Sequence, residues 1–144
     1  MKHSVTASLA SLAICSAGIT HAAVCGPDTE ADIPHLEAMK ESFLTAEYLR
    51  FAEQAGPYFP DLAKNVKDYL GQVMVVFPNG FESCETVLQR REDPGFYQDV
   101  VFFYPAGSPA PVALLLVAVA AQGEVRLIEF TFNTAISDVL EDIK

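Results

Sequence analysis

The chain has 144 residues, 51% of them hydrophobic, and a formal net charge of −10 at neutral pH. This length suits a single domain with one core. The acidic balance disfavours nucleic acid as a partner. The longest internal apolar run, residues 112–121, is far shorter than the roughly 20 residues that a membrane-spanning helix needs, so no membrane span is expected.

The first 22 residues have the pattern of a cleaved export signal. A short basic start containing Lys2 leads into an apolar run from Val5 to Ile19, and Thr-His-Ala at 20–22 places small residues at alternate positions. We therefore predict cleavage after Ala22, a single domain over residues 23–144, and an exported protein that is periplasmic or extracellular.

Cleavage would leave two cysteines, Cys25 and Cys84. Two cysteines in an oxidising compartment usually pair. Their bridge would close a loop of about 60 residues and stabilise the domain by roughly 4 kcal/mol in the chain-entropy model. The alternative is two free or intermolecular thiols.

Apolar residues at helical spacing predict one long helix from Asp32 to Ala55, which Gly56 and Pro57 end. A shorter helix is predicted from Pro60 to Gly71. Residues 72–77 are ambiguous, because a short strand or an extended link would fit them equally well.

From Cys84 onward the spacing is typical of strands. We predict four strands with short connections, at residues 84–92, 96–104, 112–121 and 124–132, and then a last helix at 135–143. Short connections imply antiparallel pairing. The third strand is apolar on both faces, which favours a central position. In the fourth strand we expect one face to carry Ile128, Phe130 and Phe132, and the other face Val125, Leu127, Glu129 and Thr131.

Helices followed by a run of strands indicate an α+β fold. We expect N-terminal helices packed on a curved four-stranded antiparallel meander, with a short C-terminal helix. This order, with the aromatic strand 96–103 and the segment Arg-Leu-Ile-Glu-Phe-Thr-Phe-Asn-Thr at 126–134, resembles the cystatin-like superfold, including the nuclear-transport-factor-two-like cones. The resemblance covers about residues 32–134. It implies a fold shared by ketosteroid isomerases, dehydratases, protease inhibitors and proteins without known activity, so it carries no single function.

The isomerases and dehydratases of that superfold use an aspartate, or a histidine–aspartate pair, inside an apolar cone. Here Asp99 and Glu129 are the candidate catalytic residues, since burial among apolar neighbours disfavours a charged carboxylate and suits a proton shuttle. The alternative places both carboxylates on the solvent face, paired with arginines. One histidine, His35, would remain in the exported chain, and neither a metal nor a cofactor is expected.

The aromatic residues suggest a binding surface instead. One long helix and two short ones do not easily cover all of them, so we expect an aromatic sheet face opposite the first helix, formed by Tyr97, Phe103, Tyr104, Phe130 and Phe132. It would serve a homodimer, a protein partner or a small apolar ligand. The alternative is that the flanking helices bury all of this aromatic surface. The sequence therefore predicts an exported, non-catalytic binding module. The alternatives are an acid–base enzyme with a cone pocket and a structural accessory of an envelope complex.

Overall fold

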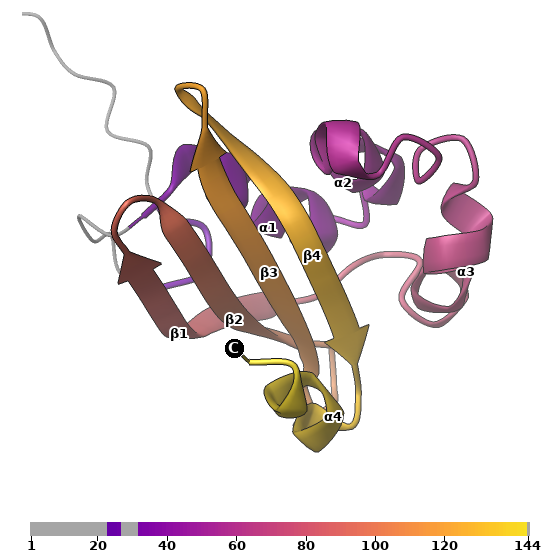
Figure 1. Ribbon diagram of the computed structural model, residues 1–144. Helices are drawn as coiled ribbons and strands as arrows, with labels where there is room; N and C mark the ends of the chain where they lie inside the picture. The colour runs from indigo at the N-terminus through magenta and orange to yellow at the C-terminus, as the bar shows by residue number, and fades with distance from the viewer. Residues whose placement is uncertain (1–22, 27–31, 144) are drawn as a thin grey trace, which may run out of the picture.

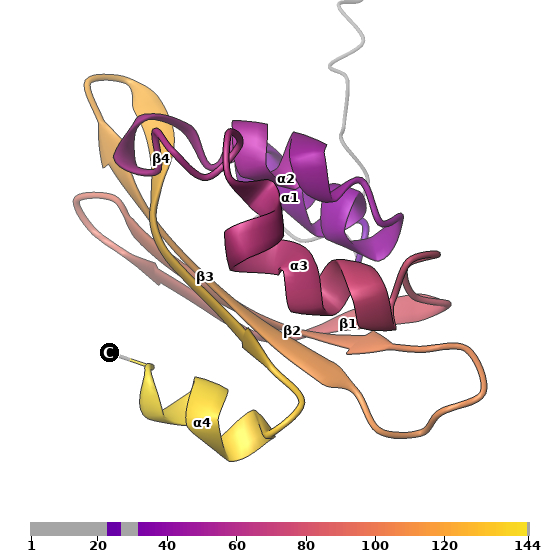
Figure 2. The same cartoon turned by 90° about the vertical axis from the view of Figure 1, so that its right-hand side faces the viewer.

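The computed structural model describes residues 23–26 and 32–143, and the predicted export signal at 1–22 lies outside these residues. Three layers are stacked on one another. Helices α1, α2 and α3 lie on one face of a four-stranded sheet, and the short helix α4 lies on the other face (Figures 1 and 2). The predicted α+β class is confirmed.

The single long helix predicted for residues 32–55 is wrong. The structure has two helices here, α1 (Pro34–Leu44) and α2 (Tyr48–Gln54). A continuous helix would bring position 47 to the buried side, because buried positions recur every three to four residues. Position 47 is an exposed glutamate, whereas Tyr48 is buried. The break shifts the apolar stripe by one residue and lets α2 bury its own apolar side.

The second predicted helix, from Pro60 to Gly71, begins and ends too early. Residues 60–65 form turns after the 3₁₀ turn η1 (Gly56–Tyr58), and the helix in this region is α3 (Val66–Val76). The helix passes through Gly71, its predicted end, and includes most of the ambiguous residues 72–77. Val73 is buried one turn after Leu70, so these two side chains keep the helical spacing on the side that faces the core. Both the strand and the extended link are therefore wrong for these residues.

The four predicted strands are confirmed, with bounds that differ by no more than one residue. They are β1 (Ser83–Glu92), β2 (Phe96–Tyr104), β3 (Val112–Ala121) and β4 (Glu124–Asn133). Each strand pairs antiparallel with the next, in the order β1-β2-β3-β4, which is the predicted meander. The apolar third strand has an inner position and is buried from Val112 to Ala118.

Both edge strands contain a β-bulge, at Val87 in β1 and at Ile128 in β4. An extra residue reverses the alternation of side chains beyond it. The faces predicted for the fourth strand are therefore wrong. The face covered by α1–α3 carries Val125, Leu127, Phe130 and Phe132, while Glu129 lies opposite Val117 on the other face.

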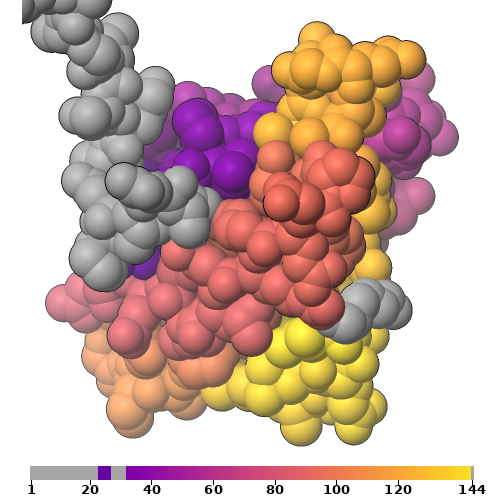
Figure 3. Space-filling view, turned by 60° about the vertical axis from the view of Figure 1, so that its left-hand side comes forward, coloured from indigo at the N-terminus to yellow at the C-terminus, as the bar shows by residue number. Residues whose placement is uncertain are grey.

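The face of the sheet away from α1–α3 is partly covered by α4 (Ile136–Glu141). This helix forms the predicted C-terminal element and buries Val139 against Val100, Ala113, Leu115 and Val117. Figure 3 shows the side of the molecule on which α4, drawn in yellow, lies against the sheet.

The larger apolar cluster lies between α1–α3 and the sheet. Phe43 of α1 is at its centre, with ring centroids 4.9–5.9 Å from those of Tyr48, Phe51, Phe81, Phe103 and Phe132. At one end of this layer, Cys25 and Cys84 form the predicted disulfide, with Cα atoms 4.9 Å apart. This bond ties the segment before α1 to β1.

Candidate functional site

Asp99, one of the two predicted catalytic residues, lies on β2 and is fully buried between α1 and the sheet. Its Oδ2 atom is 2.8 Å from Lys40 Nζ, and its Oδ1 atom is 2.5 Å from Arg91 Nη1. The carboxylate is thus shared between a cation from α1 and a cation from β1.

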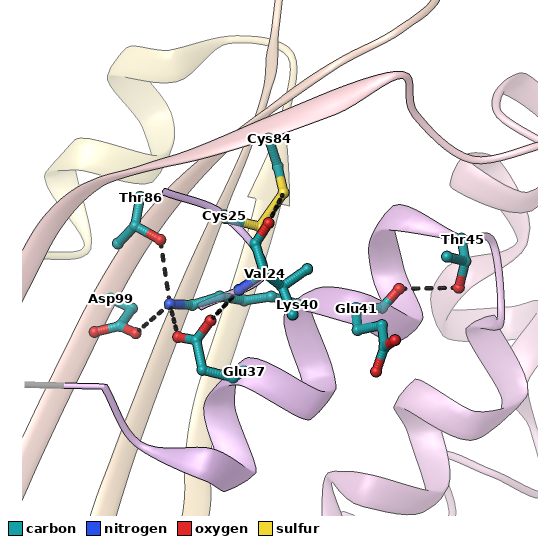
Figure 4. Close-up of a disulfide and its surroundings, with 9 residues drawn as sticks. All are labelled: Val24, Cys25, Glu37, Lys40, Glu41, Thr45, Cys84, Thr86 and Asp99. Atoms are coloured by element: carbon teal, nitrogen blue, oxygen red, sulfur yellow. Dashed lines mark hydrogen bonds and ion pairs between the residues drawn. A yellow bond between two sulfur atoms is a disulfide. The ribbon is translucent and has the colours of Figure 1, made fainter. Parts of the chain in front are cut away.

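Lys40 is itself fully buried and extends the group of charges toward the N-terminal segment. Its Nζ atom forms an ion pair with Glu37 and donates a hydrogen bond of 3.2 Å to Thr86 Oγ1. The other oxygen of Glu37, Oε2, accepts a hydrogen bond of 3.0 Å from the backbone N–H of Val24. Figure 4 shows Lys40 among Glu37, Thr86 and Asp99, with the disulfide close by.

Arg91, Asp99, Lys40 and Glu37 form a chain of alternating charges, called here the charge cluster. Buried charges are tolerated when they are paired, and each carboxylate here meets at least one cation. The two positive and two negative charges balance, so the helix layer can close over them.

Within the charge cluster, Asp99 is poorly placed to act as a general acid or general base. A catalytic carboxylate has to reach the proton that it moves, directly or through one water. Asp99 is fully buried, is held by two cations, and lines none of the three hollows described below.

Glu129, the other predicted catalytic residue, does not meet Asp99. It lies opposite Val117 on the face away from α1–α3, whereas Asp99 lies opposite Leu116 on the covered face. The bulge at Ile128 causes this separation, and the two carboxylates therefore do not form one site.

The predicted aromatic surface is also arranged differently from the expectation. Four of its five members, Tyr97, Phe103, Phe130 and Phe132, pack on the side of α1–α3. Tyr104 is half-buried at the end of β2. The expectation that these residues lie on the sheet face opposite the first helix is wrong for those four, because α1, α2 and η1 together cover more of the sheet than one straight helix would.

Three hollows lie on the side of the molecule formed by α2, η1 and α3, which is in front in Figure 2. The first hollow lies between α3 and the ends of β3 and β4, and it is lined by Gln72, Val73, Val76, Phe77, Val112, Phe132, Asn133 and Thr134. The second lies between α2 and α3, with Leu49, Arg50 and Met74 among its lining residues. The third lies beside η1, with Tyr58, Tyr69 and Phe130 among its lining residues.

Exposed apolar side chains gather on the same side. Eight large hydrophobic residues are exposed among residues 23–26 and 32–143, and five of them belong to α2, η1 or α3, namely Leu49, Tyr58, Tyr69, Val75 and Val76. Val75 is the most exposed of them, at 80%. Helix α3 buries only two side chains, Leu70 and Val73, so it presents apolar residues both toward the core and toward solvent.

Two titratable groups connect these helices to their surroundings. Tyr48 of α2 donates a hydrogen bond of 2.7 Å to the carbonyl of Phe77, and burial raises the pKa of Tyr48 to about 12. The pKa of His35 in α1 is lowered by burial, against a smaller opposing effect of a hydrogen bond with the backbone of Gln54. Among residues 23–26 and 32–143, no group of three or more histidine, cysteine or acidic side chains could hold a metal ion.

The charge cluster was only partly foreseen from sequence. The sequence pattern points to Asp99 but not to Glu37 or Lys40. The available signal was the position of Lys40, four residues after Leu36 and three before Phe43, which puts a charged residue on the apolar stripe of α1. A lysine on such a stripe needs a buried anion as a partner.

Comparisons with known proteins add no relative. No family model matches the chain, and neither a curated protein nor a solved structure matches it. The similarity to the cystatin-like superfold therefore stays a prediction. In the described part of the chain, no helix has the length and apolar character needed to cross a bilayer.

Proposed function

We propose that this protein is a small exported binding module without catalytic activity, and that it binds its ligand or partner on the side formed by α2, η1 and α3. One observation carries the proposal: in the part of the chain that the structure describes, the three hollows and five of the eight exposed large apolar side chains lie on that side. Exposed apolar residues grouped around hollows are typical of binding sites.

Export is part of this proposal. The disulfide supports it, because such bonds persist in oxidising compartments outside the cytoplasm. The predicted cleavage after Ala22 would also leave the hydrogen bonds of Val24 and the bond of Cys25 to Cys84 intact. Sequencing the N-terminus of the exported protein tests this part, with Ala23 as the expected first residue.

The first hollow is the most specific of the three. Its volume is about 160 Å³, and no charged side chain lines it, although the chain carries nineteen acidic residues. Its walls are valine and phenylalanine, while Gln72, Asn133 and Thr134 contribute neutral polar groups. A cavity of about 150 Å³ accommodates a benzene-sized group. The expected occupant is therefore a compact, uncharged apolar group, from a small molecule or from a side chain of a protein partner.

An NMR titration of the folded domain with phenol, benzoate and benzylamine tests the hollow. We expect phenol to shift amide signals of α3 and the end of β4, while the two charged probes bind at least about tenfold more weakly, because the hollow offers them no counter-charge. Equal binding of all three probes, or shifts confined to the α4 side, would contradict the proposal.

A matched pair of variants locates the site. Val76→Trp places a large ring at a residue that lines the hollow, and Val75→Trp places the same ring at an adjacent residue that does not line it. Both positions are exposed, at 57% and 80%, so both variants should fold. We expect Val76→Trp alone to abolish phenol binding. If both variants bind phenol like the parent chain, the hollow is not the binding site.

A further inference from the structure

The third hollow, beside η1, is lined largely by aromatic rings. Its volume is about 340 Å³, and the described residues that line it are Tyr58, Phe59, Pro60, Asp61, Leu62, Tyr69 and Phe130. Four of these seven residues are aromatic, and Asp61 is the one charged residue among them. The third hollow therefore differs in chemistry from the first, whose described lining residues are all uncharged.

Burial divides these lining residues into a base and a rim. At the base, Leu62 is buried, and Phe59 and Phe130 are half-buried. The rings of Phe59 and Phe130 have centroids 5.3 Å apart and planes that meet at 61°, so they form two walls set at an angle. At the rim, Tyr58 and Tyr69 are exposed, at 55% and 58%. A ligand can thus reach aromatic rings at both levels.

Backbone hydrogen bonds and ring packing hold the base in place. The N–H of Phe59 donates a hydrogen bond of 3.0 Å to the carbonyl of Gly56, and the N–H of Leu62 donates one of 3.1 Å to the carbonyl of Phe59. Phe130 also packs against Phe51 of α2, with ring centroids 5.4 Å apart. A hollow that is already formed needs little ordering when a ligand binds.

Asp61 gives the rim a negative charge. Its carboxylate lies 3.7 Å from Lys64 Nζ, but the two side chains are 66% and 75% exposed, and exposed pairs of this kind are weak. The carboxylate therefore stays accessible to a ligand cation. The whole chain has a formal net charge of −10, which also attracts cations to its surface.

The protein's own cations contact other rings. Within the described part of the chain, the cation–π contacts are those of Arg90 with Phe96 and of Arg91 with Tyr97, both on the sheet. The rings of the third hollow take part in neither contact, so a ligand cation has no competitor of this kind there.

We propose that the third hollow binds a small organic cation that carries a methylated ammonium group. Ring faces attract such a cation through their negative potential, and its methyl groups make apolar contacts with the same rings. Asp61 adds a counter-charge. A neutral ligand of the same shape gains only the apolar contacts, so the hollow selects for charge. This inference rests on the proposed function, because the hollow lies on the same binding side, but it concerns a different hollow and a different class of ligand.

An NMR titration of the exported protein with choline and dimethylbutanol tests this selectivity. Dimethylbutanol is the neutral alcohol in which a carbon atom replaces the ammonium nitrogen, so the two probes have the same shape. We expect choline to shift the amide signals of residues 58–62, Tyr69 and Phe130, and to bind at least about tenfold more tightly than the alcohol. Equal affinity for the two probes, or no binding of choline, would overturn the proposal.

Two double variants locate the site. Tyr58→Leu with Tyr69→Leu removes two rings but keeps apolar side chains, whereas Tyr58→Phe with Tyr69→Phe removes only the hydroxyl groups. Both positions are exposed, so both double variants should fold. We expect the leucine pair to weaken choline binding at least about tenfold, and the phenylalanine pair to stay within about threefold of the parent chain. If the leucine pair binds choline like the parent chain, the cation is held elsewhere and the proposal fails.

A matched pair of charge substitutions tests the counter-charge. Asp61→Asn neutralises the carboxylate at the rim, and Asp68→Asn makes the same change in net charge at an exposed residue of α3 that does not line the hollow. We expect Asp61→Asn to weaken choline binding about two- to fivefold at low salt, and Asp68→Asn to leave it nearly unchanged. Equal effects of the two substitutions would mean that the acidic chain attracts choline in general, and would overturn the role of Asp61.

Free small molecules and lipid headgroups both carry methylated ammonium groups, and sedimentation with phosphatidylcholine vesicles distinguishes these sources. If the protein sediments with the vesicles and choline releases it, the ligand is a headgroup. If choline binds but the protein does not sediment, the ligand is a free molecule. Either result supports the shared chemistry.

The location of the NMR shifts separates this inference from the proposed function. Phenol reports on the first hollow through residues 72–77 and 132–134, whereas choline reports on the third through residues 58–62. Choline binding without phenol binding would refute the proposal for the first hollow alone. Phenol binding without choline binding would refute the present inference alone.

Discussion

Replacing Lys40 with methionine tests how far the fold depends on the charge cluster. The substitution keeps a long side chain but removes the cation that contacts Glu37, Asp99 and Thr86. Asp99 keeps Arg91 at 2.5 Å, whereas Glu37 loses its cation while it stays buried. Removing one partner of a buried ion pair typically costs about 3–5 kcal/mol, because the remaining charge is left uncompensated.

We expect Lys40→Met to lower the free energy of unfolding by about 3–5 kcal/mol, measured by urea unfolding at pH 7 with the disulfide intact. Lys64→Met is the matched control, since Lys64 is 3.7 Å from Asp61 in a pair that is exposed on both sides. Exposed pairs of this kind contribute little, so the control should stay within about 0.5 kcal/mol of the parent chain.

A double variant shows whether the cost comes from an unpaired charge. Lys40→Met with Glu37→Gln removes the cation together with the carboxylate that it would leave behind. We expect this variant to be more stable than Lys40→Met alone, since the two changes are coupled. A cost below about 1 kcal/mol for Lys40→Met, or simple additivity of the two changes, would refute the reasoning.

Two further predictions concern the backbone and pH. Gly80 has a φ of +76°, and a Cβ atom there would lie 2.1 Å from the carbonyl oxygen of Leu44, so Gly80→Ala should destabilise the domain by well over the roughly 1–2 kcal/mol that positive φ alone costs. Gly107→Ala, at a φ of +72° with no atom within 4 Å, should show only that conformational cost in the same urea assay. Because burial lowers the pKa of His35 below 6.5, the unfolded chain binds a proton more readily, and stability should fall as the pH drops from about 6.5 through the lowered pKa. His35→Gln should remove this part of the pH dependence, and a histidine titration midpoint by NMR at or above 6.5 would contradict it.

The sheet could be predicted from sequence because its signals are local. Alternation, apolar runs and turn residues define each strand within a few positions, and short connections then imply the meander. The helices were harder to predict, since their ends depend on distant contacts. The break after Leu44 is one case, because the Leu44 carbonyl accepts a hydrogen bond from the N–H of Phe81, far along the chain. Helical spacing alone shows no sign of that partner.

The candidate site shows the same limit. Asp99 stood out as a carboxylate among apolar neighbours, but sequence spacing could not show that Lys40 and Arg91 would meet it from two other elements. The bulge at Ile128 had no signal either, although it decides on which face Glu129 lies. Both outcomes depend on how elements pack, and a pattern within a single element does not contain that information.

The missed helix break also changes where a binding surface should be sought. One straight helix would leave aromatic side chains of the sheet uncovered, and the sequence prediction of a binding surface on the sheet depends on that single helix. Because the chain turns between α1 and α2, Phe43 and Phe51 reach different aromatic residues of the sheet, at Phe103 and Phe130. Those rings therefore belong to the core. Of the eight large apolar side chains that are exposed among the described residues, five lie instead on the side formed by α2, η1 and α3. The aromatic residues of the sheet therefore stabilise the fold in the first place. They contribute to the proposed binding surface only through Phe130 and Phe132, each of which lines one of the hollows.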